Sequence, residues 1–428
     1  MKNNGEQKLI VGLEIGTSKV AAVVGQVFPN GMIEVSGFSS HPSKGISQGG
    51  ITDLNAIANA IQRAIESAAD VAHCQIESVI ISITGKHIHS LNESGVVAIG
   101  EDEEVTQEDI DQAVMTARSV KIGDGLSLLQ VIPQEFALDD RMNITDPLGL
   151  QGMRLTARAH LIACQQAALA NLKKAVGLCH SKLNIPLQVD RVFYSGYASA
   201  EAVLTEDEKN LGVCVIDFGA GTMDIAVYTQ GKLRLSKSLT YAGNRVTNDI
   251  THYFSTPFHE AEEIKIQYGS AMYPPRTQQN AEIKIKSATP GRVLTCDKSE
   301  LSEIIAPRYF ELLNLVKNEL NKLKEELDSK KINSELISGV VITGGAALTQ
   351  DLVQCAEIVF QCPVRIGYPI DVSGMTDYVH NPAYSTAIGL LRCYQNQDTG
   401  IEEKDEDSLS KKLYFKLKKF VNKVRSEF

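Results

Sequence analysis

The sequence lacks an excess of basic residues, paired cysteine motifs and long apolar runs. Its formal net charge at pH 7 is −10, whereas nonspecific nucleic-acid binding needs a basic field, so that class is excluded. The eight cysteines include no Cys-x-x-Cys pair, so we expect reduced thiols rather than a disulfide framework or a zinc site. No segment approaches the roughly 18 uninterrupted apolar residues of a membrane-spanning helix. We therefore expect a protein that stays on the cytoplasmic side of a membrane.

A pattern of strand, acid, glycine, hydroxyl and strand occurs twice in this 428-residue chain. Residues 11–24 contain it as Glu-Ile-Gly-Thr, and residues 213–229 contain it as Asp-Phe-Gly-Ala-Gly-Thr. Either copy alone is equally well explained as an ordinary hairpin with a tight turn. Because the copies lie about half the chain apart, and 43% of the residues are hydrophobic, the pair predicts a duplicated, two-lobed architecture with a large core.

Turns of this kind suit phosphate binding, because successive backbone N–H groups form an anion-binding concavity and glycine allows close approach. The candidate residues are Gly16, Thr17, Ser18 and Lys19 in the first turn and Gly219, Ala220, Gly221 and Thr222 in the second. Asp217 cannot contact a phosphate favourably, so we expect it to hold a hydrated Mg²⁺ ion through water. The sequence thus predicts that one hairpin from each lobe encloses the phosphates of a nucleotide.

A third glycine turn, formed by Gly344, Gly345 and Ala346, follows an apolar strand and precedes a helix. We expect Thr349 to open that helix. Such a turn allows a base or ribose to pack on the main chain, although it also occurs in any α/β fold. The remaining candidates are Gly243 and Asn244, which precede another predicted helix, and Glu262 and Lys265, which are three residues apart on one helix face. The alternative for the last pair is a solvent-exposed ion pair.

The order of these motifs resembles the actin, sugar-kinase and DnaK-type chaperone superfamily and, within it, the FtsA family of bacterial cell-division proteins. The resemblance extends over essentially the whole chain, and its motifs are the two hairpins, AEEIK at 261–265, ITGGAALTQ at 342–350 and YSTAIGLL at 384–391. It implies an α/β, actin-like two-lobed fold of duplicated ribonuclease-H-like cores with ATP and Mg²⁺ between the lobes. It also implies filaments that tether FtsZ to the cytoplasmic face of the inner membrane at midcell.

The resemblance divides the chain into subdomains. The first lobe would have its core (1A) at 1–85 and 165–193, with an inserted α+β subdomain (1C) at 86–164 that contacts later division proteins. The second lobe would have its core (2A) at 194–231 and 306–395, with an outer subdomain (2B) at 232–305 that receives the C-terminal peptide of FtsZ. Within the insert, residues 105–120 predict a helix with Thr106 as its N-cap.

Two residues depart from the family pattern. Ala220 stands where relatives often have the middle glycine of the second phosphate turn, which brings one methyl group close to the phosphates. Tyr194 stands where related ATPases have a glutamine or glutamate that orients the attacking water. Because a phenol is a poor substitute, we expect slow or negligible ATP hydrolysis and assign no catalytic residue.

The last 33 residues carry a separate signal. Residues 396–410 are polar and acidic, which predicts a flexible linker. Residues 411–428 predict an amphipathic helix whose apolar side chains fall within an arc of about 100°, namely Leu413, Leu417, Phe420, Val421, Val424 and Phe428. Cations occupy the other face, including Lys412, Lys416, Lys419 and Lys423. We expect this helix to lie in the interface of an anionic membrane; the alternative is a terminal helix docked on the protein's own core.

Three classes of function fit these features. The first is the ATP-binding, membrane-tethering filament protein that the resemblance implies. The second is a small-molecule kinase of the same superfamily, for which we identify no substrate-activating carboxylate and which leaves the amphipathic tail unexplained. The third is a DnaK-type chaperone, for which too few residues follow the nucleotide lobes to form a peptide-binding domain.

Overall fold

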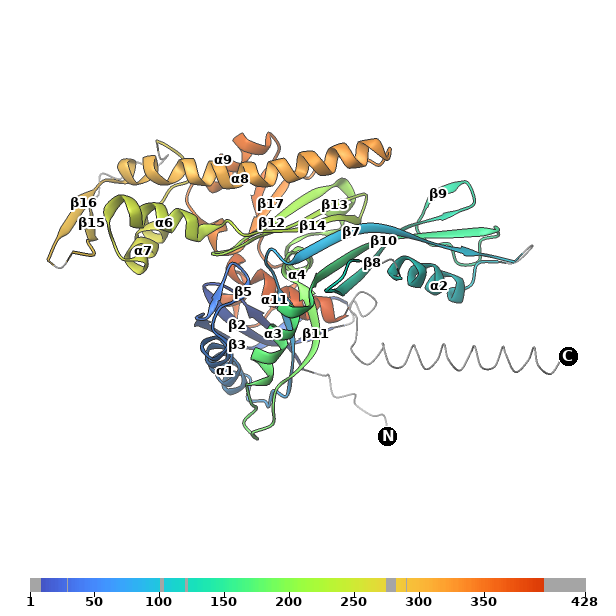
Figure 1. Ribbon diagram of the computed structural model, residues 1–428, viewed down its shortest axis with the longest axis horizontal. Helices are drawn as coiled ribbons and strands as arrows, with labels where there is room; N and C mark the ends of the chain where they lie inside the picture. Colours follow the sequence, from blue (N-terminus) through green and yellow to red (C-terminus); the bar gives the residue numbers. More distant parts are fainter. Residues whose placement is uncertain are drawn as a thin grey trace.

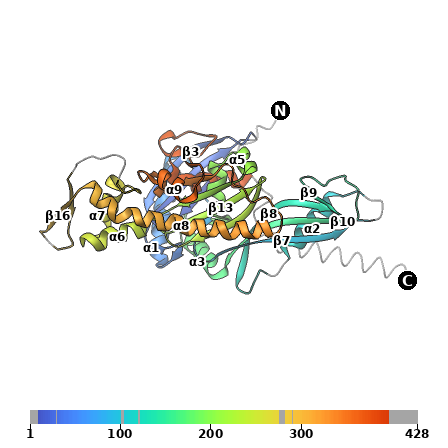
Figure 2. The same ribbon diagram turned by 90° about the horizontal axis from the view of Figure 1, so that it is seen from above.

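A computed structural model describes residues 9–28, 30–100, 104–119, 122–274, 282–289 and 291–395 of the protein. Two lobes, each built on one mixed sheet, form the centre of the molecule. Figures 1 and 2 show an inserted subdomain and an outer subdomain at opposite ends of the long axis, with the two lobes between them. The linker and membrane helix predicted for residues 396–428 lie outside the described residues.

The first lobe contains a six-stranded sheet in the order β11-β6-β1-β2-β3-β19. Its strands are β1 (Ile10–Ile15), β2 (Lys19–Val27), β3 (Ile33–Pro42), β6 (Ser78–Ile83), β11 (Gln188–Tyr194) and β19 (Val372–Ser373). Strands β1, β2 and β3 form an antiparallel meander, and β6 pairs with β1 in parallel. Helices α1 (Leu54–Val71) and α3 (Gln166–Gly177) belong to this lobe, with the short strands β4 (Ile46–Ser47) and β5 (Gly50–Ile51).

The second lobe repeats this topology in a five-stranded sheet, ordered β14-β13-β12-β17-β18. The strands are β12 (Val213–Phe218), β13 (Met223–Thr229), β14 (Lys232–Leu239), β17 (Val340–Thr343) and β18 (Val364–Ile366). Here β12, β13 and β14 form the antiparallel meander, and β17 pairs with β12 in parallel, as β6 does with β1. The two-lobed α/β architecture predicted from the repeated hairpins is therefore confirmed.

Burial explains why the amino-acid patterns of the two hairpins differ from those of ordinary surface strands. Every residue of β12 and β13 is buried, and β2 is buried over most of its length. A strand covered on both faces has no solvent-facing side, so it appears as a continuous apolar run rather than as an alternation. An acid inside such a run, such as Asp217 or Asp224, therefore needs polar partners within the fold.

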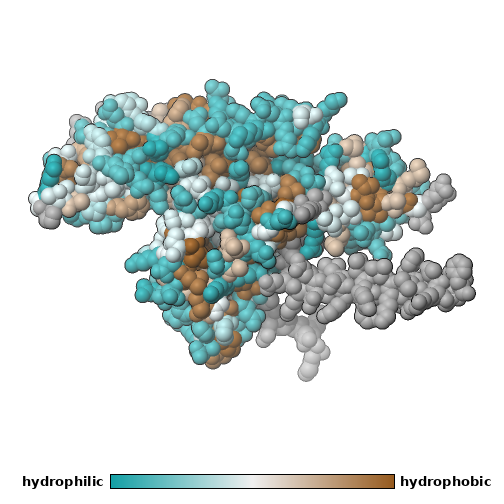
Figure 3. Space-filling view, in the orientation of Figure 1, coloured by the Kyte–Doolittle hydropathy of each residue, from teal (hydrophilic) through white to brown (hydrophobic). Residues whose placement is uncertain are grey.

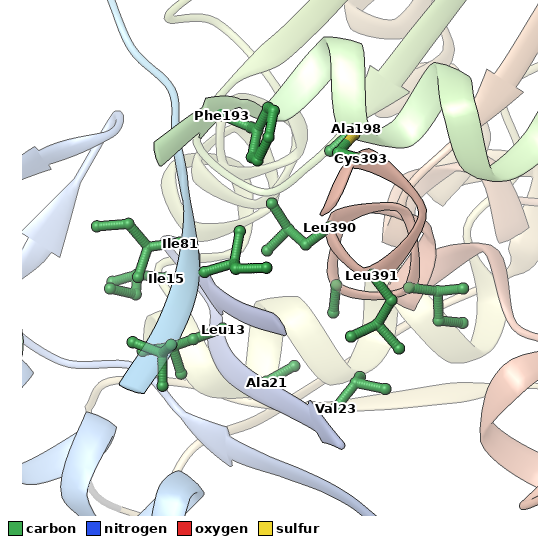
Figure 4. Close-up of a cluster of buried hydrophobic side chains, with 14 of the residues drawn as sticks. Leu13, Ile15, Ala21, Val23, Ile81, Phe193, Ala198, Leu390, Leu391 and Cys393 are labelled. Carbon is green, nitrogen blue, oxygen red and sulfur yellow. The ribbon is translucent and has the colours of Figure 1, made fainter. Parts of the chain in front are cut away.

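Two helices pack together between the lobes. Helix α4 (Ser195–Val203) and helix α11 (Ser385–Gln395) lie in contact, and a Cβ atom on Gly389 would collide with the backbone of Ala198. Figure 4 shows Leu390 and Leu391 of α11 on the side that faces Leu13 and Val23 of the first-lobe strands, with Ala198 of α4 beside Cys393 on the other side of α11. Helix α11 contacts β1, β2 and β6 of the first lobe, whereas α4 contacts mainly β12, β13 and β14 of the second, so the helix pair joins the two lobes.

The inserted subdomain is a four-stranded sheet with one helix. The sheet order is β7-β10-β8-β9, formed by β7 (Ile88–Ala98), β8 (Leu126–Leu138), β9 (Arg141–Ile144) and β10 (Arg154–Gln165), and helix α2 (Gln107–Arg118) packs on it. Thr106 caps α2 as predicted, in a reciprocal capping box with Asp109. An α+β insert in the first lobe is thus confirmed.

The outer subdomain contains α6 (Gly243–Phe254), α7 (Phe258–Tyr268), β15 (Ile283–Lys286), β16 (Val293–Cys296) and part of the long helix α8 (Lys298–Ser329). Strand β14 hydrogen-bonds to β13 and stays in the second-lobe sheet, so the outer subdomain begins after Leu239 rather than at residue 232. The remaining elements are α5 (Glu206–Leu211), η1 (Gly345–Leu348), α9 (Leu352–Phe360), α10 (Thr376–Val379) and η2 (Pro382–Tyr384).

The surface seen in Figure 3 is mainly hydrophilic, with apolar residues in separate groups. Scattered apolar residues of this kind are normal on a folded protein. Within the described ranges, no helix combines the length and the hydropathy that a membrane-spanning segment requires.

Candidate functional site

A cavity of about 460 Å³ lies where the two lobes face one another, a size typical of small-ligand sites. Its walls come from the β1–β2 turn, the β12–β13 turn, the start of α6, one face of α7 and the turn after β17. All of the predicted nucleotide-site residues line it except Asn244, the second residue of α6. The structure thus brings together motifs that lie more than 300 residues apart in the sequence.

The first hairpin turn is closed by a backbone hydrogen bond of 2.9 Å from the Gly16 N–H to the Lys19 carbonyl. The Lys19 ammonium donates to the Glu14 carboxylate at 2.6 Å and lies 5.5 Å from the ring centre of Tyr384. Burial raises the pKa of Glu14, and Lys19 partly offsets this effect. Lys19 is therefore engaged within the first lobe, and its positive charge neutralises a buried acid beside the turn.

The second hairpin turn is built in the same way and touches the first. The Gly219 N–H donates to the Thr222 carbonyl at 2.9 Å. A Cβ atom on Gly221 would collide with the Thr17 side chain, so glycine here allows the two lobes to meet at their turns. Ala220 also lines the cavity, and its carbonyl accepts from the Asn244 N–H at 2.8 Å. Asn244 thus supports the turn from behind.

Asp217 is fixed by two hydroxyl groups from the interlobe helices. Its Oδ2 atom accepts from Ser199 Oγ of α4 at 2.5 Å and from Thr386 Oγ1 of α11 at 2.7 Å. The two hydroxyls lie 2.8 Å from each other. One side of the carboxylate is therefore held by the protein, while the residue still lines the cavity.

The third glycine turn differs from the prediction in how its helix starts. Gly344 has a φ angle of +87°, which favours glycine, and a Cβ there would collide with Asp217. Thr349 does not cap the helix: a 3-10 turn at Gly345–Leu348 intervenes, and α9 starts at Leu352 with Asp351 as its N-cap residue. The Thr349 hydroxyl instead pairs with that of Tyr309 at 2.9 Å, because the intervening turn carries it away from the helix end.

Lys265 is buried and its partner Glu262 is only partly exposed, so the two do not form a solvent-exposed ion pair. The Lys265 ammonium donates to Glu262 at 2.7 Å, to the Thr247 hydroxyl at 2.9 Å and to the Gly243 carbonyl at 3.3 Å. Only 8% of Lys265 is exposed, and burial lowers its pKa. Gly243 is the first residue of α6 rather than preceding it. The pair therefore ties α7 to the start of α6 at the cavity wall.

A polar contact between the lobes, not predicted from the sequence, lies on the cavity wall. The Thr84 hydroxyl, which follows β6 of the first lobe, donates to Asp224 of β13 in the second lobe, at 2.6 and 2.7 Å from its two carboxylate oxygens. Burial, followed by the nearby charge of Asp217, raises the pKa of Asp224 to about 7. The available signal was a carboxylate inside the otherwise apolar β13 segment.

Two apolar residues on the cavity wall were also missed. Ile266 of α7 and Leu348 of η1 both line the cavity, although 72% and 53% of their surfaces are exposed. Nothing in their local sequence distinguishes them from ordinary surface residues. Their placement on one cavity is decided by the packing of α7 and the turn after β17.

Tyr194 lies outside the cavity wall. It is fully buried, and its phenol accepts from the Ile225 N–H at 3.1 Å and donates to the Lys237 carbonyl at 2.7 Å. Its pKa is raised well above the ordinary value, mainly by burial. With its hydroxyl committed to the backbone of β13 and β14, Tyr194 serves the packing of the second-lobe sheet.

The fold and cavity define a class of proteins, those with the actin-like fold. A chain of the PilM-PilN type IV pilus biogenesis complex has a TM-score of 0.62 at 16% identity, covering 90% of this chain and 98% of that one. MreB5 of Spiroplasma citri bound to ADP has a TM-score of 0.52 at 14% identity, covering 92% and 97%. These similarities establish the fold alone.

Sequence relatives are more specific. Cell division protein FtsA of Escherichia coli K12 is 45% identical over 99% of both chains, and that of Pseudomonas aeruginosa PAO1 is 41% identical over 90% of this chain and 88% of its own. Family profiles match as "Cell division protein FtsA" at 214–389 and "SHS2 domain inserted in FTSA" at 85–163. The chain belongs to the FtsA family of cell-division proteins, which sets aside the kinase and chaperone alternatives.

The raised pKa of Asp224 leads us to predict how the free energy of unfolding depends on pH. Because the folded state holds a proton that the unfolded state releases, stability from this group falls as the pH rises from about 4 to about 7. An Asp224→Asn variant removes this penalty, so its free energy of unfolding relative to wild type should rise by about 3 kcal/mol between pH 5 and pH 8. Urea unfolding at both values measures the change. Asp190→Asn, at an exposed site, is the control; equal pH dependence in all three proteins would contradict the assignment.

Proposed function

We propose that this protein binds ATP with Mg²⁺ in the interlobe cavity, assembles into filaments and tethers FtsZ to the inner membrane at the division site. The observation that carries the nucleotide proposal is the meeting of two glycine turns, one from each lobe, at one cavity. Backbone N–H groups of such turns bind phosphate oxygens. Among the solved structures with this fold, those of MreB5 carry ADP and AMPPNP.

The cavity suggests where each part of the nucleotide lies. The phosphates would occupy the two turns, and the ribose would pack on Gly345, beside which a Cβ would meet no atom closer than 4.0 Å. Ile266 and Leu348 would contact the base, because exposed apolar side chains on a cavity wall suit a flat aromatic ligand. Lys265 and Glu262 would supply the polar contacts of the nucleoside.

The charge of the cavity favours a nucleotide that carries a divalent cation. Four acids line it, Glu14, Asp217, Asp224 and Glu262, against two lysines, Lys19 and Lys265, which are both paired with acids. A polyphosphate alone would add like charge to this wall. Within the described residues no cluster of three or more acids, histidines or cysteines could hold a metal ion. Mg²⁺ would therefore be held by phosphate oxygens, water and Asp217, where it would neutralise charge.

Replacing Gly345 with leucine tests the nucleotide site. Gly345 lines the cavity, and a Cβ atom there would meet no protein atom closer than 4.0 Å. The fold should therefore survive while ATP affinity falls at least tenfold, or by about 1.4 kcal/mol or more. Isothermal titration calorimetry measures the affinity, and circular dichroism checks the fold. Gly177→Leu, at an exposed glycine of α3, is the matched control. If the ATP affinity of Gly345→Leu is unchanged, the adenosine does not bind at this turn.

An Asp217→Asn substitution tests the metal. The amide keeps the shape of the carboxylate and its contact with Ser199 or Thr386, but it loses the negative charge that attracts a hydrated cation. ATP binding in the variant should depend much less on Mg²⁺ than in wild type. Titrations with and without the ion measure this difference, and an unaltered dependence would show that another group holds the metal.

Turnover should be slow, because the Tyr194 phenol is buried and bonded to backbone groups and no glutamine stands in its place. Single-turnover release of phosphate from assembled protein is the assay, since an unassembled chain would be slow for other reasons. We expect a rate well below roughly 1 per second, the lower end of ordinary enzyme turnover. A faster rate would mean that a different side chain orients the water.

The tethering proposal rests on the outer subdomain and on the tail. A surface pocket between α6 and α8, lined by Asp249, His252, Tyr253, Pro307, Arg308 and Glu311 among others, is a candidate site for the C-terminal peptide of FtsZ. We assign membrane binding to residues 411–428, which lie outside the described part of the chain. Burial of a Leu or Phe side chain is worth roughly 1.5–3 kcal/mol, so six partly inserted residues suffice for reversible attachment. The insert would contact later division proteins.

A vesicle experiment tests the tether as a whole. Wild-type protein should carry FtsZ into the pellet with vesicles that contain anionic lipid, and neutral lipid or high salt should weaken this. Phe420→Glu puts a charge in the apolar stripe and should leave both proteins in the supernatant without altering ATP binding. Leu183→Glu, at an exposed apolar residue of the first lobe, is the control. If Phe420→Glu sediments like wild type, the tail is not the anchor.

A further inference from the structure

Strand β14 is the edge of the second-lobe sheet, and its free side is covered by the inserted subdomain. In the described part of the chain no strand pairs with that side. Instead, polar side chains of the insert hydrogen-bond to the backbone of β14: Gln134 to the Leu233 carbonyl at 2.5 Å, Asn92 to the Arg234 carbonyl at 3.0 Å, and Ser90 to the Ser236 carbonyl at 2.7 Å. An exposed edge would be a site of unwanted pairing, so the insert serves as its cover.

The charged and imidazole side chains next to this contact are as buried as residues of a hydrophobic core. Arg234 of β14, 3% exposed, donates to both carboxylate oxygens of Glu135 in β8, at 3.2 and 2.9 Å. His160 of β10 is fully buried between Asn92 and Ser236, and burial, with the charge of Arg234, lowers its pKa to about 3. Separating the insert from β14 would break the buried Arg234–Glu135 ion pair and the contact between His160 and Ser236, and the loss of a buried ion-pair partner is costly.

The insert is attached to the first lobe in a different way. At the base of β8, the Gln130 side chain donates to the Val192 carbonyl at 2.6 Å and accepts from the Tyr194 N–H at 3.2 Å. These residues end β11, where the chain leaves the first-lobe sheet for α4. Strand β8 is therefore attached to the first lobe close to the point where the chain crosses to the second lobe. The contact of the insert with β14, by contrast, extends along the length of that strand.

Strand β14 is also linked to the cavity wall, through Thr84 and the residue that follows it. Just before β7, the Gly85 N–H donates to the Ser238 hydroxyl of β14 at 3.1 Å, and Thr84 donates to Asp224. Ser238 stands two residues from Ser236, the partner of Ser90 and His160. A shift of β14 relative to the first lobe at the cavity would therefore be carried along one strand to the insert.

We propose that the inserted subdomain moves with the second lobe as one body, although its sequence is inserted in the first, and that its angle to the first lobe reports whether the cavity is open or closed. The reporting step rests on the proposed binding of ATP between the lobes. The docking step does not, because it follows from the contacts with β14 alone.

Distances between spin labels test both steps in the full-length chain. Labels carried on unnatural amino acids at three exposed sites, Gln112 in the insert, Arg63 in the first lobe and Lys324 in the second, avoid the native cysteines. With Mg²⁺ and a non-hydrolysable ATP analogue, the Gln112 to Arg63 and Arg63 to Lys324 distances should shift together, while the Gln112 to Lys324 distance stays constant. A shift in the Gln112 to Lys324 distance, or a fixed Gln112 to Arg63 distance with bound nucleotide, would overturn the proposal.

A variant without nucleotide separates this proposal from the proposed function. Replacing Ser90, Asn92 and Gln134 with alanine removes the side-chain contacts to β14 and should broaden the Gln112 to Lys324 distribution, while Arg63 to Lys324 is unchanged. Ser36→Ala, which removes a serine-to-backbone bond inside the first-lobe sheet, should change neither. A narrow distribution in the triple variant overturns the docking step. If calorimetry detects no ATP binding by the wild-type protein while the insert docks normally, the proposed function is refuted. The reporting step then fails with it, but the docking step stands.

Discussion

The contact between α4 and α11 is the constraint on which the rest of the structure depends. Gly389 brings the backbone of α11 against that of Ala198, a separation that any side chain would increase. At this distance Ser199 and Thr386 face each other and share Asp217. The packing of two helices therefore sets the position of a carboxylate in the cavity.

The cavity combines close backbone approach with strong burial of charge. Gly221 stands where a Cβ would collide with Thr17 of the other lobe, so the two lobes touch at their turns. Gly344 stands where a Cβ would collide with Asp217 of the same lobe, so the third turn lies against this carboxylate. The same closeness removes water from the acids, which is why the pKa values of Glu14 and Asp224 are raised. A site of this kind is suited to a ligand that brings its own cation, because the cation relieves repulsion among the acids as well as among the phosphates.

Local patterns were enough to find most of the cavity, because its turns need particular residue types. The glycine, hydroxyl and acid sequence of each hairpin, repeated at half-chain spacing, indicated two lobes and the residues that line their cleft. The prediction that Thr349 opens a helix was wrong. A 3-10 turn followed by a helix can have the same amino-acid composition as a helix that begins at a capping threonine. Thr84 gave no signal, since its partner Asp224 lies 140 residues away.

The sequence by itself determined the duplicated hairpins, the capped helix of the insert and the family, because backbone conformation at glycine and helix capping are local requirements. Only the tertiary structure decided that Lys265 is buried, that Tyr194 is held by backbone groups and that the insert docks on β14. Burial and hydrogen-bond partners depend on segments brought together from distant parts of the chain. The free side of an edge strand, for example, looks the same in a sequence whether solvent or another subdomain covers it.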